Sequence, residues 1–126
     1  MAPPDLRYTK EHEWVRPAGE TATVGITDYA AKQLGDIVFV ELPEAGRQLS
    51  QFAAVGVVES VKAVSDLFAP IGGEVVEVNG ELATRPELVN EDPYGAGWML
   101  RLRLTDAAQL DELLAADDYD ELTREG

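Results

Sequence analysis

The stretch Val57-Val58-Glu59-Ser60-Val61-Lys62-Ala63-Val64-Ser65-Asp66 sets one lysine among small and β-branched residues, with a carboxylate on each side. A lysine that only supplies surface charge usually has polar neighbours, whereas Val61 and Ala63 offer Lys62 no salt-bridge partner. The segment therefore predicts an attachment site at Lys62. An ordinary surface lysine on a strand remains the alternative from this segment alone.

Outward from this segment, the chain is predicted to be mainly β. Residues 55–78 are rich in valine and interrupted by Pro70, Gly72 and Gly73, which predicts several short strands joined by tight turns. Residues 21–27 alternate, with small or apolar side chains on one face, and predict a half-buried strand. Residues 98–104 alternate in the same way and predict Trp98 and the three following leucines pointing inward. Residues 37–40 are apolar on both faces, which predicts a core strand covered by two layers.

Three helical segments are predicted. The first covers residues 28–34, begins at Thr27 or Asp28 as cap and ends at Gly35. A single turn is expected near residues 86–89. An acidic C-terminal helix is expected over about 105–122, with Gln109 at capping-box spacing and its leucines on one face.

Length and charge limit the function further. A chain of 126 residues fits a single domain, 1–126, that can bury a core without disulfides. The net charge of −14 argues against nucleic-acid binding, since phosphate contacts need clustered cations. Half of this charge lies in residues 106–125, which hold eight acids and one base. This acidic tail is either a solvated face or a surface that steers basic partners.

Independent catalysis has little support in the sequence. The absence of cysteine removes disulfides, thiolate zinc sites and cysteine nucleophiles, and we expect no metal site. There is one histidine and no glycine-rich phosphate loop, so catalytic triads and nucleotide cradles are unsupported. No apolar run approaches the roughly 20 residues of a membrane span, so no membrane partner is expected. We expect a carrier rather than an enzyme.

Several blocks in a fixed order identify a family. They are His12-Glu13-Trp14, Gly25 to Ala30, Leu34 to Pro43, Glu59 to Ala63, Pro70-Ile71 with Gly73 to Asn79, and Pro86 to Asn90 with Pro93-Tyr94-Gly95 and Gly97-Trp98. Together the blocks resemble the H protein of the glycine cleavage system, over about residues 8–119. That resemblance implies a flattened β-barrel sandwich hybrid, like lipoyl and biotinyl domains, with short helices added. It also implies that lipoate is attached covalently to Lys62, on a β-turn, within a lipoylation motif of Glu59, Ser60, Val61 and Ala63.

The resemblance implies partners as well. A pyridoxal-phosphate glycine decarboxylase (P protein) would load the methylamine group of glycine on the arm. A tetrahydrofolate-dependent aminomethyltransferase (T protein) would unload it, and dihydrolipoyl dehydrogenase (L protein) would reoxidise the arm, which lipoylating enzymes first install. In the family the loaded arm folds into a surface cleft, where carboxylates matching Glu13 and Asp66 contact the amine. Glu11 departs from the small polar residue often found there, which leaves its effect on the cleft open.

Other interpretations remain open at this point. The chain could be a lipoyl or biotin carrier domain of another multienzyme complex, although biotin carriers usually flank their lysine with methionines, and Met1 and Met99 are far from Lys62. It could also be an interaction module without modification. We expect a monomer in the bacterial cytoplasm, or in the mitochondrial matrix if the chain is a processed eukaryotic one.

Overall fold

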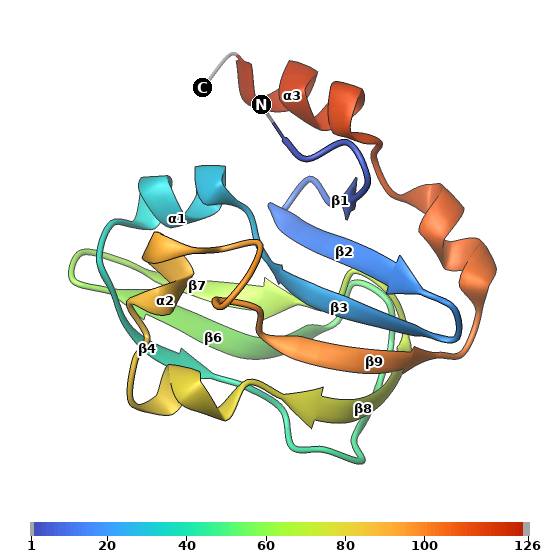
Figure 1. Ribbon diagram of the computed structural model, residues 1–126, viewed down its shortest axis with the longest axis horizontal. Helices are drawn as coiled ribbons and strands as arrows, with labels where there is room; N and C mark the ends of the chain where they lie inside the picture. Colours follow the sequence, from blue (N-terminus) through green and yellow to red (C-terminus); the bar gives the residue numbers. More distant parts are fainter. Residues whose placement is uncertain (1, 125–126) are drawn as a thin grey trace.

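The computed structural model describes residues 2–124, which form two antiparallel sheets around a shared core (Figure 1). The larger sheet has the strand order β1-β2-β3-β9-β8-β5, and the smaller one has the order β4-β6-β7. The strands are β1 Arg7–Tyr8, β2 Glu13–Ala18, β3 Thr21–Ile26, β4 Ile37–Glu41, β5 Gln48–Leu49, β6 Ala54–Ser60, β7 Val64–Phe68, β8 Gly73–Val78 and β9 Leu100–Leu104. The predicted mainly β fold with short helices is confirmed.

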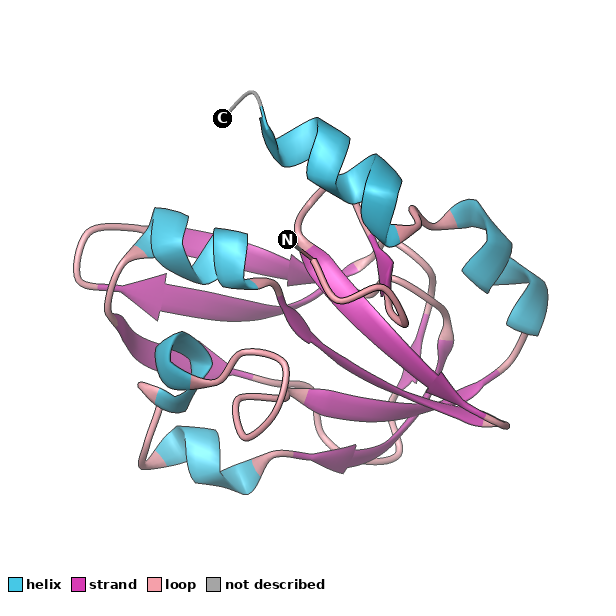
Figure 2. Cartoon of the chain, turned by 45° about the horizontal axis from the view of Figure 1, so that its top comes forward, coloured by secondary structure: helices cyan, strands magenta, loops and turns pink. Residues whose placement is uncertain are grey.

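The helices are short and lie at the periphery of the sheets (Figure 2). They are α1 Asp28–Leu34, the 3-10 helix η1 Gly80–Ala83, α2 Leu88–Glu91, the 3-10 helix η2 Ala107–Glu112 and α3 Ala116–Arg124. The predicted bounds of α1 are confirmed: the Thr27 side chain accepts a hydrogen bond from the Ala30 amide, and Gly35 ends the helix with φ of 85°. That left-handed conformation favours glycine.

The C-terminal segment is helical in two pieces rather than one. The predicted continuous helix breaks at Leu113, because Leu114 leaves the helix to pair with Tyr8 in an isolated antiparallel bridge. Asp106 caps η2 by accepting a hydrogen bond from the Ala108 amide. Gln109 does not complete a capping box, since its side-chain oxygen accepts a hydrogen bond from the Gly72 amide at 2.7 Å.

The strand prediction for residues 98–104 was wrong at its start. Strand β9 begins at Leu100, and Trp98 lies before it, only partly buried, with the Arg101 guanidinium 4.7 Å from its ring centre. The Asn79 side-chain amide donates a hydrogen bond to the Trp98 carbonyl at 2.8 Å. This carbonyl is therefore bonded to a side chain, whereas in a regular strand it would bond a neighbouring strand. The inward leucines Leu100 and Leu102 are buried as predicted.

The prediction of a doubly covered strand at residues 37–40 was also wrong. In β4 only Ile37 and Val40 are buried, while Val38 and Phe39 are about half exposed. The cause is a register shift between Ile37 and Phe39, together with the place of β4 at the edge of the smaller sheet. An extra residue in one strand interrupts the alternation and turns consecutive side chains outward.

Two groups of buried residues hold the molecule together. The main core fills the space between the two sheets, and strand β3 contributes Ala22, Val24 and Ile26 to it, as its alternation predicted. A second group joins the N-terminal segment to α3, where the rings of Tyr8 and Tyr119 stack with centres 4.6 Å apart. Burying aromatic rings in this way supplies large apolar area. The second group therefore fixes β1 and the C-terminal segment beside each other (Figure 1).

Candidate attachment site and acidic cavity

Lys62 lies at the tip of the hairpin that joins β6 to β7, which projects at the left of Figure 1. The Ser60 amide donates to the Ala63 carbonyl at 2.8 Å and closes the turn. Val61, Lys62 and Ala63 are all exposed. No Asn-Gly or Asp-Gly pair flanks this lysine, so hairpin rules alone could not place it on a turn.

The Ser60 side chain organises this turn from inside. It is only 7% exposed, and its hydroxyl oxygen accepts hydrogen bonds from the Lys62 and Ala63 amides at 3.2 and 3.0 Å. Ser60 Oγ also lies 3.3 Å from the Ala63 carbonyl oxygen, to which it donates. Side-chain bonds of this kind satisfy backbone groups that a tight turn leaves unpaired. The serine therefore sets the backbone from which Lys62 projects.

The tip is also anchored to the loop after α1. The Val61 amide donates to the Asp36 carbonyl at 3.0 Å. A methyl group placed on Gly35 would stand 3.4 Å from Lys62 Cε, so the lysine stem lies along this glycine. Within residues 2–124 no ion pair involves Lys62. An amine held this way is open to acylation, and the residues present fit an amide-linked arm.

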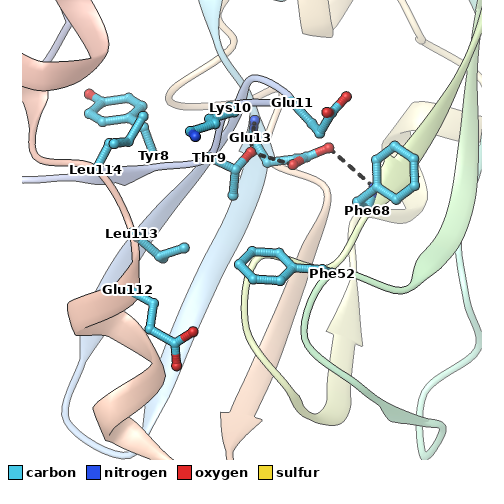
Figure 3. A pocket seen from close by; sticks show the side chains of 10 residues that line it. All are labelled: Tyr8, Thr9, Lys10, Glu11, Glu13, Phe52, Phe68, Glu112, Leu113 and Leu114. Carbon is cyan, nitrogen blue, oxygen red and sulfur yellow. Dashed lines mark hydrogen bonds between the residues drawn. The ribbon is translucent and has the colours of Figure 1, made fainter.

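A cavity of about 470 Å³ lies at the other end of strand β7 (Figure 3). Its walls come from the N-terminal segment, the loop before β6, the end of β7 and the segment after η2. The lining residues are Tyr8, Thr9, Lys10, Glu11, Glu13, Phe52, Phe68, Glu112, Leu113 and Leu114. Apolar surface makes up most of the lining by area, as is usual for ligand-binding cavities, although Thr9 and four charged residues also line it.

Glu13 is the buried carboxylate of this cavity, with 1% of its surface exposed. The Thr9 hydroxyl donates to Oε1 at 2.5 Å, and the Phe68 amide donates to Oε2 at 3.1 Å (Figure 3). A carboxylate has about four acceptor positions, so these two bonds leave room for a further donor. Glu13 can thus serve as an acceptor for a cation that enters the cavity.

Burial raises the pKa of Glu13 to about 7, because the charged form loses its hydration. The hydrogen bonds from Thr9 and Phe68 oppose this rise, since they favour the charged form. Near neutral pH, a carboxyl group with this pKa is neutral in part of the molecules and charged in the rest. A cationic ligand would shift it to the charged form.

Asp66 does not line the cavity and is exposed on β7. Side chains alternate along a strand, so Val64, Asp66 and Phe68 lie on one face. Of these, Phe68 lines the cavity and Val64 stands next to the tip turn. Asp66 therefore lies between Lys62 and the cavity rather than beside Glu13.

Sequence reasoning missed most of the cavity wall. Thr9 stands four residues before Glu13 and carries no motif, and its role depends on a turn in which His12 has φ of 75°. Phe52 is also in a left-handed conformation, with φ of 68°, which no propensity predicts for phenylalanine. Leu113 reaches the cavity only because the tail helix breaks beside it.

His12, part of the recognised block, is held in a structural network. Its Nδ1 lies 2.8 Å from the Tyr119 hydroxyl, which in turn lies 2.7 Å from the Thr27 hydroxyl. Burial lowers the pKa of His12, against the opposing effect of Glu11. This histidine links the N-terminal segment to α3 and the start of α1.

These features define a class: a sandwich of two small antiparallel sheets that presents one lysine on an exposed hairpin turn is a lipoyl-domain-like carrier. The family model described as glycine cleavage H-protein matches residues 6–126. The chain belongs to this family, whose members are lipoyl carriers of the glycine cleavage system.

Two similar proteins and one solved structure illustrate the match. The glycine cleavage system H protein of Symbiobacterium thermophilum is 60% identical over 124 residues, covering 98% of this chain and 97% of its own length. That of Thermus thermophilus is 58% identical over 120 residues, covering 95% and 94%. The crystal structure of a glycine cleavage system H protein from Mycobacterium marinum superposes with a TM-score of 0.87 at 44% identity, covering 95% of this chain and 97% of that one. Within residues 2–124, no helix is long and apolar enough to cross a membrane.

Proposed function

We propose that Lys62 holds lipoate through an amide at Nζ, and that the chain shuttles the methylamine group of glycine. It receives this group from the pyridoxal-phosphate glycine decarboxylase and delivers it to the tetrahydrofolate-dependent aminomethyltransferase, and dihydrolipoyl dehydrogenase then reoxidises the carrier. The observation that carries this proposal is the exposed lysine on a side-chain-braced turn, without an ion-pair partner within residues 2–124.

The polypeptide itself acts as a non-catalytic carrier in this proposal. When bound, the lipoyl group supplies a disulfide that accepts the methylamine group. The hairpin supplies reach, because a tethered group meets each partner active site at a high effective concentration. Ser60 and the Val61 anchor keep the base of the arm in one orientation while its far end moves.

Glu13 protects the amine of the cargo. In a cargo bonded to the arm through sulfur, the lone pair of the neutral amine would form a double bond to the shared carbon and expel the thiolate, and protonation of the amine removes that lone pair. A buried carboxylate next to an ammonium group favours the charged form of both, and exclusion of water strengthens that preference. The Glu13 carboxyl group has a pKa raised to about 7. When an ammonium group enters the cavity, Glu13 therefore loses its proton to water and becomes charged.

Asp66 acts earlier, along the path between the turn and the cavity. Its exposed carboxylate lies on the face of β7 that leads to Phe68. A charge in water is partly screened, so its attraction for the ammonium is weaker than that of Glu13. Asp66 therefore guides the cargo, and Glu13 retains it.

The first experiment is a mass measurement of the chain purified from its own host grown with lipoate. Fragmentation of the peptide with Lys62 is expected to locate a lipoyl-sized mass increment on this residue. A biotinyl increment would redirect the function to carboxylases. An unmodified Lys62 in cells with active lipoylation would leave an interaction module as the better explanation.

The second experiment measures how long the loaded carrier keeps its cargo. Glu13→Ala combined with Asp66→Ala is expected to shorten that lifetime, because both carboxylates are lost. Glu112→Ala is the matched control, since Glu112 also lines the cavity but is exposed. An unchanged lifetime in the double variant would remove the protective role of both residues.

We also propose that the whole chain, 1–126, acts as one monomeric domain in the bacterial cytoplasm, together with its lipoylating enzymes. The bridge between Tyr8 and Leu114 supports the single domain, because it joins the two ends of the sequence. The bacterial setting rests on the organisms of the similar proteins.

A further inference from the structure

The outer face of the smaller sheet carries exposed apolar side chains that packing does not explain. Phe39 of β4 pairs with Glu59 of β6, which pairs with Val64 of β7. Residues paired across a sheet point to the same side, so these three form one row, called the outer row here. Phe39 is 49% exposed and Val64 is 68% exposed. Large apolar groups gathered on a surface mark a site of interaction.

The outer row is continuous with the attachment turn. Val61, next to Lys62, is 69% exposed, and Val38, next to Phe39, is 50% exposed. Exposed apolar side chains therefore stand on β4, on β7 and at the turn, on either side of Glu59 in the central strand β6. Strands β6 and β7 form the hairpin that projects in Figure 1.

Acids border this apolar surface. Glu41, Val57 and Asp66 form the next row on the same face, two residues further along the strands. With Glu59 in the outer row, three carboxylates accompany the apolar groups, and no ion pair within residues 2–124 involves any of them. A partner that covers this face needs apolar contacts for Phe39 and Val64 and basic groups that meet Glu59 and the next row, because charge complementarity guides and orients association.

We propose that the outer row and Val61 are the docking surface for the enzyme that acylates Lys62, and that this enzyme has apolar contact groups interspersed with Arg or Lys. This inference rests on the proposed attachment at Lys62. The acylating enzyme is the partner that must bring its active site to Nζ itself, one side-chain length from the turn. The enzymes that would load, unload or reoxidise the far end of the arm act at a distance from this surface, so they have less need to contact it.

Phe39 distinguishes docking from simple access to the turn. It lies two strands away from β7, at roughly 4.8 Å per strand, so only a partner that covers the whole sheet face contacts it. It also lies off the line of β7 that leads from Lys62 to the cavity, so the arm itself does not require it.

The test measures acylation of purified, unmodified chain by a lipoate–protein ligase with lipoate and ATP, over a range of carrier concentrations. Phe39→Thr and the double variant Phe39→Thr with Val64→Thr place β-branched side chains in the strands and remove apolar contact. We expect KM to rise about fivefold for the single variant and about tenfold or more for the double variant, with kcat nearly unchanged. Leu122→Gln is the matched control, since Leu122 is 43% exposed but lies on α3, and its KM should equal that of the unaltered chain.

The outcomes separate this proposal from the attachment itself. If the unaltered chain is acylated and both variants keep its KM, the docking surface is wrong while Lys62 remains the attachment site. If the unaltered chain is not acylated at any concentration, the proposed function fails first. Thermal unfolding of each variant, matched to the unaltered chain, shows that a rise in KM comes from the surface and not from misfolding. A Glu59→Gln variant whose KM depends less on salt supports the basic groups of the partner, and an unchanged salt dependence contradicts them.

Discussion

The attachment turn and the acidic cavity, at opposite ends of strand β7, are built in contrasting ways. The turn is largely local: it exposes Lys62, the Ser60 side chain holds it by hydrogen bonds within a few residues of sequence, and the bond from Val61 to Asp36 is its longer-range anchor. The cavity collects residues from Tyr8 to Leu114 and buries Glu13 almost completely. The contrast fits the proposed roles, since an attachment point for several enzymes needs exposure, whereas a carboxylate binds a cation more strongly where water is excluded. Changes at the turn should therefore alter modification, and changes at the cavity should alter stability and its pH dependence.

The largest effect is expected from Lys62→Arg. Lipoylation should be lost completely, because a guanidinium group stays protonated and does not form this amide. The free energy of unfolding should change by less than about 0.5 kcal/mol, since Lys62 is exposed. Intact mass measures the loss of lipoylation, and urea unfolding measures the change in stability. Lys32→Arg is the control, since this exposed lysine pairs with Asp28, and label appearing on Lys32 in the Lys62 variant would contradict the assignment.

The next effect concerns the pH dependence that Glu13 gives to stability. Its pKa rises from 4.5 to about 7 on folding, so the native state binds more protons than the unfolded state within that window. Below pH 4.5 the carboxyl group is neutral in both states and costs nothing. As the pH rises to 7, ionisation of Glu13 lowers the free energy of unfolding by about 3 kcal/mol, and this loss of stability persists above pH 7.

Glu13→Gln should remove this loss, so its stability relative to the unaltered chain should rise between pH 5 and pH 8. Urea unfolding at several pH values measures the free energy of unfolding of both chains. The difference between the two values reports Glu13 alone, because all other titrating groups are common to both chains. Glu112→Gln, at an exposed position of the same cavity, should keep the fall of the unaltered chain. Parallel pH profiles for Glu13→Gln and the unaltered chain would show that Glu13 is not the titrating group.

A smaller effect is expected from Ser60→Ala, which removes the hydroxyl that braces the turn. Leaving the Lys62 and Ala63 amides without this partner should cost about 1 kcal/mol of unfolding free energy. It should also slow lipoylation, because the base of the arm loses its fixed orientation. Ser65→Ala, at an exposed position, is the control and should stay within about 0.5 kcal/mol of the unaltered chain. Equal values for the two variants would mean that the turn does not depend on its serine.

The smallest effect is expected from Asp66→Asn. The side chain is exposed and has no ion-pair partner within residues 2–124, so stability should change by less than about 0.5 kcal/mol. At pH 4.5, where the ionisation of Glu13 does not lower the stability of the unaltered chain, Glu13→Ala should cost clearly more, because it leaves the Phe68 amide and the Thr9 hydroxyl without their acceptor. Thermal unfolding of the two variants side by side tests the contrast between exposed and buried carboxylates, and equal losses would abolish it.

The parts of the fold that could be predicted from sequence depend on local patterns. Alternation placed β3, and capping residues placed α1, because both signals lie within the element that they define. The exposure of Phe39 could not be predicted, since it depends on a bulge and on an edge position that only strand pairing determines. The break of the tail at Leu113 escaped prediction for the same reason: its cause is a partner, Tyr8, at the other end of the sequence.

The candidate site divides in the same way. Lys62 and Glu13 were found through contiguous motifs that mark a family. Thr9, Phe52 and Phe68 carry no such motif and meet only in space, through a left-handed turn and the end of a strand. The sequence motif identified Glu13, but the burial that raises the pKa of Glu13 arises only when the walls of the cavity come together in the fold.

The bridge between Tyr8 and Leu114 also orders events while the chain is being made. Contacts between residues distant in sequence form late, because a long loop must close before they gain anything. Once a growing chain has left the ribosome as far as the end of β7, every residue of the lysine hairpin has emerged, but Leu113 and Leu114 of the cavity wall have not. On a growing chain, the proposed attachment site thus emerges before the cavity that we propose to shelter the cargo.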